Sequence, residues 1–444
     1  MPDKRRKRLF TYLLMALTAA VFGLACCFNL ARSPYERAAA SLPAELKAAK
    51  AEGLALTPED LIQTPRVADE RNAALLYQQI NLANITSTDE DVLTAVRKPH
   101  PTPAQRKAAS AVILKAAPAL LLAEKAADLP GCDFHRNWAL GPDLPLPEYG
   151  VLRKLARVLA AKAAIQADSG YPEEALRSIR IGACITYHLG DEPILIPLLV
   201  RIAIEAIMDQ PMRHLMCRYA DRPDILRLAA QTNRAFDREL DLERAMRGEV
   251  VMCRIVTKML RTGEVDDFYG YKQRLLLLPR RTVADAYEAH SISFWRRNFA
   301  ALRSGRLDSM AQYQAMLAVS INEDARSLNK TGTTKPSYEM EAIVSPFFYS
   351  SALRATSNEA RRRLRKTMFA LFGYRQSRGR FPVRLADLST IQLPDPFTGK
   401  PLGYRSNGKT FTLYSVGENL IDDGGSSKRP KKGDQPLDIV ATYP

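Results

Sequence analysis

Apolar residues recur at helical spacing over most of this chain. Two such stretches, at residues 149–168 and 171–189, carry apolar stripes that return every three or four positions, and Gly170 separates them. This spacing puts the apolar side chains on one face of each helix, so we expect the two to pack as an antiparallel pair. Further stretches of the same kind extend the array, at 69–80, 103–127, 194–208, 224–260, 284–302 and 309–322. The pattern predicts a mainly α-helical protein.

The period changes near the C-terminus. A last long amphipathic helix ends at Gly379, and apolar and polar residues then alternate at residues 411–414, just after Asn407-Gly408. An Asn-Gly pair before such alternation is typical of a β-hairpin with a two-residue loop. Residues 438–442 are a candidate third strand. We therefore expect a small C-terminal α+β module that contains a β-hairpin or a three-stranded sheet.

The N-terminal residues predict a membrane anchor. Five basic residues at positions 4–8 precede Leu9 to Phe28, a run of uncharged and mostly apolar residues. At 1.5 Å per residue this run is about 30 Å long, the thickness of a bilayer core. The basic residues favour a cytoplasmic N-terminus, so a single pass through the cell (inner) membrane would leave the bulk of the chain extracytoplasmic. A cleaved signal peptide and lipidation at Cys26 or Cys27 remain the alternatives.

These patterns divide the chain into five parts, as expected for a length beyond the usual limit of a single core. They are a basic cytoplasmic tip at 1–8, the transmembrane anchor at 9–28, an extracytoplasmic helical domain at 29–328, a linker at 329–348 and the C-terminal module at 349–444.

Charge adds a constraint on partners. The chain has 64 Lys+Arg against 48 Asp+Glu, a formal charge of +16, which can favour nucleic acid, anionic lipid or acidic polymers. Part of the excess lies in the tip and part in the cluster Arg361–Lys366. Because the predicted anchor places this cluster outside the cytoplasm, we expect no nucleic-acid binding and a position near anionic lipid.

The sequence assigns no catalytic residue and no cofactor-binding residue. It contains no P-loop, no Gly-x-Ser-x-Gly, no His-Glu-x-x-His and no dinucleotide fingerprint. Three Cys/His pairs have the spacing of two of the four ligands of a zinc site. They are Cys132 with His135, Cys184 with His188, and His214 with Cys217. We interpret the first pair as part of a loop packed under Trp138 and the other two as ordinary helix residues. Cys132, Cys184, Cys217 and Cys253 are either buried thiols or two disulfides.

The junction between the two central helices resembles the middle of a tetratricopeptide repeat. The stretch from Ala167 to Leu176 ends one helix at Gly170 and starts the next with an acidic turn. Only one copy is legible, so the resemblance implies a tetratricopeptide-like hairpin within the array and no peptide-binding groove.

The C-terminal motifs resemble those of type II secretion pseudopilins. In order they are Gly379-Arg380-Phe381-Pro382, Asp395-Pro396-Phe397-Thr398-Gly399, Tyr414-Ser415-Val416-Gly417 and Asp422-Asp423-Gly424-Gly425. The resemblance covers the last fifth of the chain and implies a calcium site in the loop after Tyr414, held by Asp422, Asp423 and Glu418 with backbone carbonyls. Residues 7–12 lack the Gly and the Glu of the family's cleavage site, so the resemblance does not extend to processing and filament assembly.

The whole layout, including Asp69-Glu70-Arg71-Asn72-Ala73-Ala74, is also similar to uncharacterised bacterial membrane-anchored proteins. The sequence therefore favours a non-catalytic extracytoplasmic scaffold that binds a protein partner in the cell envelope or its secretion machinery. The alternative is a hydrolase of envelope polymers that uses carboxylates, and enzymatic activity stays open.

Overall fold

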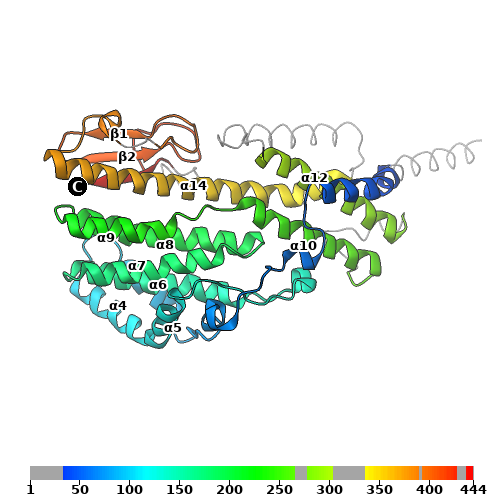
Figure 1. The fold of residues 1–444 in the computed structure, drawn as a ribbon, viewed down its shortest axis with the longest axis horizontal. Helices are drawn as coiled ribbons and strands as arrows, with labels where there is room; N and C mark the ends of the chain where they lie inside the picture. The colour runs from blue at the N-terminus through cyan, green and yellow to red at the C-terminus, as the bar shows by residue number, and fades with distance from the viewer. Residues whose placement is uncertain (1–33, 266–277, 304–335, 390–392, 428–436, 444) are drawn as a thin grey trace, which may run out of the picture. The chain divides into compact units, whose positions relative to one another are not determined.

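The computed structural model describes residues 34–265, 278–303, 336–389, 393–427 and 437–443. These residues form a mainly helical protein with a three-stranded antiparallel sheet near the C-terminus, which confirms the predicted class (Figure 1). No helix in the described part of the chain is long and apolar enough to cross a bilayer. The predicted tip and anchor, residues 1–28, lie outside the described residues.

The chain forms two compact units. Unit 1 takes Met1–Thr57, Val250–Ala300 and Leu317–Phe347, and unit 2 takes Pro58–Glu249, Ala301–Met316 and Phe348–Pro444. The C-terminal residues from Phe348 onward therefore group with the helical array in unit 2.

Unit 1 contains the helical residues 34–51 and most of α10 (Leu242–Thr262) and α12 (Arg280–Arg303). Its core includes the rings of Tyr35 and Tyr287, which meet edge to face with centroids 6.2 Å apart. Arg296 of α12 pairs with Glu45 at 2.6 Å and with Glu52 at 2.5 Å. These ion pairs join the first described helix of the chain to α12.

Unit 2 contains the remaining elements. Its short 3-10 helices are η1 (Pro58–Leu61), η2 (Asp69–Arg71), η3 (Trp138–Asp143), η4 (Arg234–Phe236) and η5 (Leu385–Asp387). Its α-helices are α2 (Ala73–Tyr77), α3 (Ser87–Ala95), α4 (Pro103–Lys115), α5 (Ala117–Ala127), α6 (Pro147–Asp168), α7 (Pro172–Leu189), α8 (Leu195–Arg218), α9 (Pro223–Asn233) and the larger part of α14 (Pro336–Arg378). Its strands are β1 (Gly403–Ser406), β2 (Phe411–Ser415) and β3 (Ile439–Tyr443).

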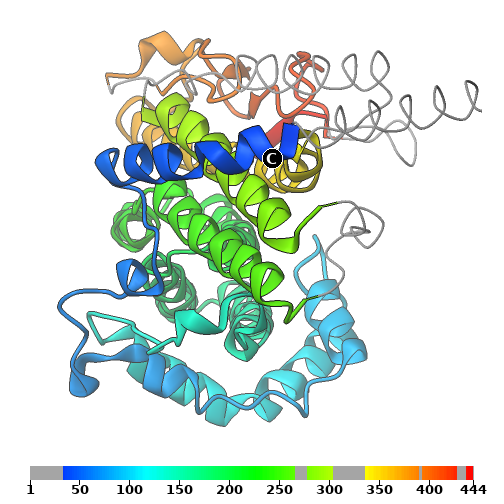
Figure 2. The same ribbon diagram turned by 90° about the vertical axis from the view of Figure 1, so that its right-hand side faces the viewer.

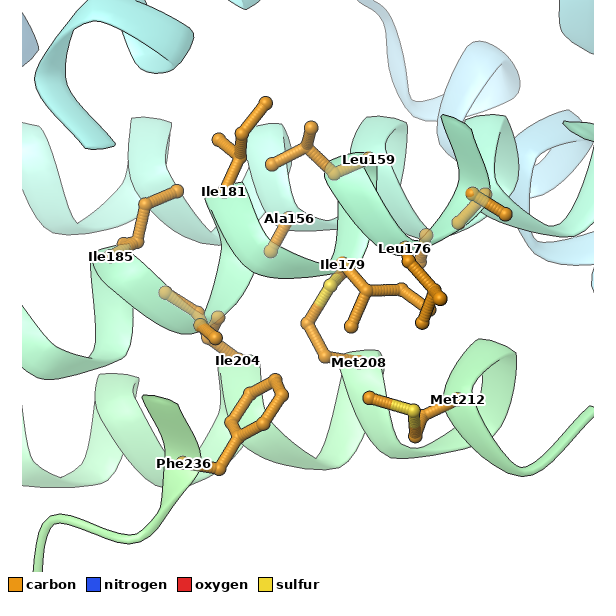
Figure 3. Packing of buried hydrophobic residues seen from close by; sticks show 14 of the residues in the cluster. Ala156, Leu159, Leu176, Ile179, Ile181, Ile185, Ile204, Met208, Met212 and Phe236 are labelled. Atoms are coloured by element: carbon orange, nitrogen blue, oxygen red, sulfur yellow. The ribbon is translucent and has the colours of Figure 1, made fainter. Parts of the chain in front are cut away.

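Helices α6, α7 and α8 form the centre of unit 2 and pack against one another (Figure 1). Figure 3 shows Met208 of α8 directed toward Ile179 of α7 within the apolar core. The two helices approach closely because residue 182 is glycine: a Cβ there would lie 2.4 Å from the Met208 sulfur. Helices α6 and α7 also pack against each other, so the predicted pairing of the stretches 149–168 and 171–189 is present in the fold.

The cyan helices α3 to α5 lie beside this centre (Figure 2), where α3 and α4 contact α6 and α5 contacts α7. A capping box starts α4, because Thr102 accepts from the Gln105 N–H at 3.2 Å and Gln105 accepts from the Thr102 N–H at 2.8 Å. The stretch 103–127 is divided by a break at Ala116, two residues before Pro118, which separates α4 from α5.

The sheet has the order β1-β2-β3, and β3 confirms the candidate third strand. The prediction of a two-residue hairpin loop is wrong, because four residues, 407–410, connect β1 to β2. Asn407 organises this longer turn: its side-chain oxygen accepts from the N–H groups of Lys409 at 2.9 Å and Thr410 at 2.8 Å.

Helix α14 differs from the sequence prediction in two ways. It begins at Pro336, inside the predicted linker 329–348. Its basic cluster was expected near anionic lipid, but Arg362 and Arg365 of this cluster are buried. Arg362 pairs with Glu205 of α8 at 3.0 Å, and Arg365 pairs with Asp209 of α8 at 2.6 Å. These pairs, together with apolar residues of α14 in the main core, join the C-terminal part of the chain to the helical array.

Candidate anion-binding pocket

A cavity of about 620 Å³ opens at the C-terminal end of α6. Helix α8, the segment 96–101 and Thr442 of β3 form its other walls. We call it the basic pocket, because five of its side chains are cationic and one is a carboxylate. The cationic residues are Arg97, Lys98, Arg106, Arg213 and Arg218, and the carboxylate is Asp168.

Asp168 is the last residue of α6, and cations surround it. Its carboxylate lies 2.8 Å from His214 Nε2, 3.8 Å from Arg106 Nη2 and 4.0 Å from Arg218 Nη1. Arg218 also donates to the carbonyl oxygens of Ala167 and Asp168, both at 3.0 Å, and so caps the end of α6. One carboxylate is thus shared among three basic side chains and cannot neutralise the whole pocket.

The segment Arg97–Pro101 supplies the opposite wall. Gln210 of α8 donates to the Arg97 carbonyl oxygen at 2.5 Å, and the Arg97 side chain donates to the Leu93 carbonyl oxygen at 3.2 Å. Burial, together with the neighbouring charge of Arg157, lowers the pKa of Arg97. Burial is the larger of the two causes, and the positive charge of Arg157 adds to it. An anion beside Arg97 would oppose both effects.

Lys98 is exposed at the pocket. Within the part of the chain that the structure describes, its ammonium group makes no ion pair or hydrogen bond. The segment is turned sharply at His100, whose φ is +55° and therefore left-handed. The segment thus places Lys98 at the wall of the pocket, where its ammonium group has no counter-ion among the described residues.

Arg213 joins the helical wall to the sheet. It pairs with Asp209 of α8 at 2.8 Å and donates to the Val440 carbonyl oxygen of β3 at 3.0 Å. Close by, the Cys217 sulfur lies 3.7 Å from the Thr442 carbonyl oxygen. Burial, only partly offset by Arg213, raises the pKa of Cys217 to about 11, so this cysteine is a neutral thiol at physiological pH and a poor nucleophile.

The three Cys/His pairs do not meet at a zinc site. Within the described residues no group of three His, Cys, Asp or Glu side chains is arranged to hold a metal, and the four cysteines there are free thiols. Both ring nitrogens of His188 are engaged, one with the Tyr77 hydroxyl at 2.8 Å and the other with the Leu129 carbonyl oxygen at 2.9 Å. His214, in contrast, faces Asp168 in the basic pocket.

The loop predicted to bind calcium holds its acidic residues in separate contacts. Asp422 accepts from the Gly424 N–H at 2.9 Å, and Asp423 accepts from the Asn419 side chain at 2.8 Å. Glu418 instead accepts from Ser357 of α14 at 2.9 Å. The calcium site stays a prediction.

Asp438 is an acidic residue of this loop region that the sequence did not indicate. Its carboxylate accepts from the N–H groups of Gly425 at 2.6 Å and Asp423 at 3.3 Å. Burial, opposed by these hydrogen bonds and reinforced by the charges of Asp422 and Asp423, raises the pKa of Asp438. Asp438 is therefore a further carboxylate beside Asp422 and Asp423, next to the predicted calcium site.

Two motifs that stand out in the sequence have structural roles. Asp395 is buried, and its carboxylate accepts from Phe397 N–H, Ser415 Oγ and Val416 N–H, each at 2.9 Å. Asn72 accepts from the Asp133 N–H at 2.9 Å and donates to the Asp133 carbonyl oxygen at 2.8 Å, which fixes the loop after Gly131. These contacts account for both motifs without a ligand.

The basic pocket itself was not predicted. Its residues come from α4, α6, α8, β3 and the segment before α4, and no short motif links them. The one visible signal was the run Arg97-Lys98-Pro99-His100-Pro101, in which two prolines limit the backbone of a charged turn. No protein-family model, curated protein or solved structure matches this chain.

Proposed function

We propose that the protein is a non-catalytic scaffold held at the inner membrane, and that its helical unit binds an acidic segment of a partner protein in the basic pocket. The observation that carries this proposal is the charge of the pocket, whose cavity of about 620 Å³ is lined by five cationic side chains and one carboxylate. Arg213 has a counter-ion in Asp209, and the other four cations have only Asp168 within the lining. A cavity of this size accommodates a ligand rather than a few waters.

Electrostatics favours an acidic partner. Opposite charges in a hollowed, partly buried surface attract a ligand and orient it as it approaches. The charge of Lys98 has no counter-ion among the described residues. The side chain of Arg106 is 44 % exposed, and its nearest carboxylate oxygen, on Asp168, lies 3.8 Å away. An entering carboxylate would pair with these two groups without breaking a close ion pair of the folded protein.

Catalysis receives less support from the same pocket. A hydrolase of envelope polymers with paired carboxylates needs two such groups facing one cleft, and this lining contains only Asp168. The neutral thiol of Cys217 removes the other obvious nucleophile. A binding role therefore fits the pocket better than hydrolysis by paired carboxylates or catalysis by a cysteine nucleophile.

Three finer features belong to the proposal. The anchor at residues 9–28 would hold the chain at the membrane with its bulk outside the cytoplasm. The hairpin α6–α7 would be tetratricopeptide-like within the helical array, which the short turn at Gly170, with φ of +88°, supports. The order of long helix α14 followed by an antiparallel sheet supports a pseudopilin-like C-terminal part.

The proposal is tested by crosslinking in intact cells. A photoreactive amino acid replaces Pro99, an exposed and uncharged residue of the pocket lining, in the full chain. Captured proteins are identified by mass spectrometry. We expect one reproducible envelope protein with an acidic segment, and we expect Arg106→Glu to abolish its capture.

Lys107→Glu is the matched control, because it makes the same change of charge at the next residue, which is exposed and does not line the pocket. Capture of random membrane proteins, or equal loss with both variants, would contradict the proposal. A reporter enzyme fused to the C-terminus that is active only in the cytoplasm would contradict the topology.

A further inference from the structure

A second polar cavity, of about 20 Å³, lies in unit 2 and shares no residue with the basic pocket. Its lining combines the apolar side chains of Ile62 and Trp138 with a concentration of charge. The charged residues are Arg66, Asp133, Arg136, Asp191 and Glu192. This volume has room for about one oxygen atom with its hydrogens.

Arg136 is fixed on most of its sides. Its Nε lies 3.3 Å from Glu192, and its Nη1 lies 3.1 Å from Glu148. The guanidinium also stacks on the rings of Phe134 at 4.5 Å and Tyr149 at 5.0 Å. Glu192 is held in turn by the Tyr149 hydroxyl at 2.6 Å. The position of Arg136 is thus determined before any ligand binds.

Two buried polar atoms of this lining have no hydrogen-bond partner in the described structure. They are Nη2 of Arg136, a side chain that is 5 % exposed, and Oδ2 of Asp133. The nearest basic nitrogens to Asp133 Oδ2 are Arg66 Nη1 at 3.7 Å and His135 Nε2 at 3.8 Å, both beyond hydrogen-bond distance. Buried polar atoms are normally paired, so a donor and an acceptor left over at one cavity indicate that it takes up a small polar group, either a water or the hydroxyl of a ligand.

The leftover pair specifies the chemistry of that group. Arg136 can only donate, and an ionised Asp133 can only accept, so a group that accepts from one and donates to the other satisfies both. A hydroxyl does this with a single oxygen atom, which is what the cavity can hold. A carboxylate or phosphate does not fit, because it is larger and cannot donate to Asp133.

We propose that this cavity binds one hydroxyl group of a neutral saccharide. A hydroxymethyl group projects furthest from a sugar ring, so it can enter a narrow cavity while the ring lies outside. The side chains of Ile62, 36 % exposed, and Arg66, 45 % exposed, line the cavity and reach solvent, where they can contact that ring. The indole of Trp138 is buried and lines the cavity, so its environment changes when a hydroxyl enters.

The test uses the full-length protein labelled with 5-fluorotryptophan. The chain has two tryptophans, so fluorine NMR gives one resonance for Trp138 and one for Trp295, an internal control in unit 1. Methyl α-glucoside and methyl β-N-acetylglucosaminide are titrated, each against its 6-deoxy analogue. We expect at least one sugar to shift the Trp138 resonance saturably, and its 6-deoxy analogue to bind about tenfold more weakly.

Asp133→Asn is the variant of choice. It keeps the size of the side chain and the acceptor for the His135 N–H, while Asn72 holds only the backbone of residue 133. We expect it to abolish the shift, whereas Asp91→Asn, at an exposed position of α3, should not. The proposal is overturned if no sugar moves the Trp138 resonance, if the 6-deoxy analogues bind equally well, or if a crystal structure with the sugar present shows only a water in the cavity.

Discussion

At the scale of residues, the most consequential contacts are the buried ion pairs between α8 and α14. The sequence places Arg201 and Glu205 four residues apart on a helix, and they form an ion pair within α8 at 3.1 Å. Glu205 also pairs with Arg362. The sequence revealed the first pair because its partners lie one helical turn apart. It did not reveal the second, because the partners are separated by more than 150 residues of chain.

Asp209 gives a direct test of these pairs. Its carboxylate is bound by Arg365 at 2.6 Å and Arg213 at 2.8 Å, so Asp209→Asn leaves two buried or half-buried guanidinium groups without their counter-ion. We expect the variant to lower the free energy of unfolding by about 3 kcal/mol at neutral pH. Asp224→Asn, at an exposed residue paired with Arg222, should have little effect in the same chemical denaturation experiment. Equal losses in the two variants would contradict this interpretation.

The same residue predicts a pH dependence. Burial alone would raise the pKa of Asp209, but Arg213 and Arg365 outweigh burial and hold the pKa below its ordinary value. The ionised form is therefore favoured in the folded state. Its contribution to stability is complete above the unfolded pKa of about 3.9 and is lost as the pH falls through the folded pKa. In Asp209→Asn this part of the acid destabilisation should disappear, which acid titration of unfolding measures.

At the scale of elements, hydrophobic periodicity predicted helices well and their surroundings less well. The stripes on α6 and α7 identified a packed pair, because buried positions repeat with the helical period. For α14 the same reasoning was insufficient. Periodicity shows which face of a helix is polar, but it does not show which other element packs against that face. The cluster Arg361–Lys366 was expected near anionic lipid, yet Arg362 and Arg365 pair with carboxylates of α8.

The loop after β2 carries the calcium prediction. If Asp422 and Asp423 bind calcium, the ion should stabilise the full-length protein by about 2.7 kcal/mol at a concentration one hundred times the dissociation constant. Magnesium should stabilise it less, because it prefers a rigid octahedral site. Asp423→Asn should remove the effect, while Glu59→Gln, an exposed change outside the loop, should not. Calorimetry that detects no heat on calcium addition, with no melting shift, would end this prediction.

At the scale of the whole molecule, the sequence predicted the class of fold but not the candidate site. The helices and the small sheet follow from local patterns. The basic pocket depends on how α8 brings His214, Arg213 and Arg218 to the end of α6, and such an arrangement is a property of tertiary packing. The grouping of the C-terminal residues with the helical array in unit 2 likewise depends on contacts between distant segments.

The central claim is that the basic pocket binds an acidic segment, and a binding isotherm tests it most directly. Full-length protein in detergent is titrated with a fluorescent oligoglutamate peptide at low and high salt. We expect saturable binding that weakens as salt rises, because partly exposed charges are screened. Arg106→Glu should raise the dissociation constant by about tenfold or more, and Lys107→Glu by less than about twofold. Equal weakening by both substitutions, or no saturable binding at low salt, would contradict the account.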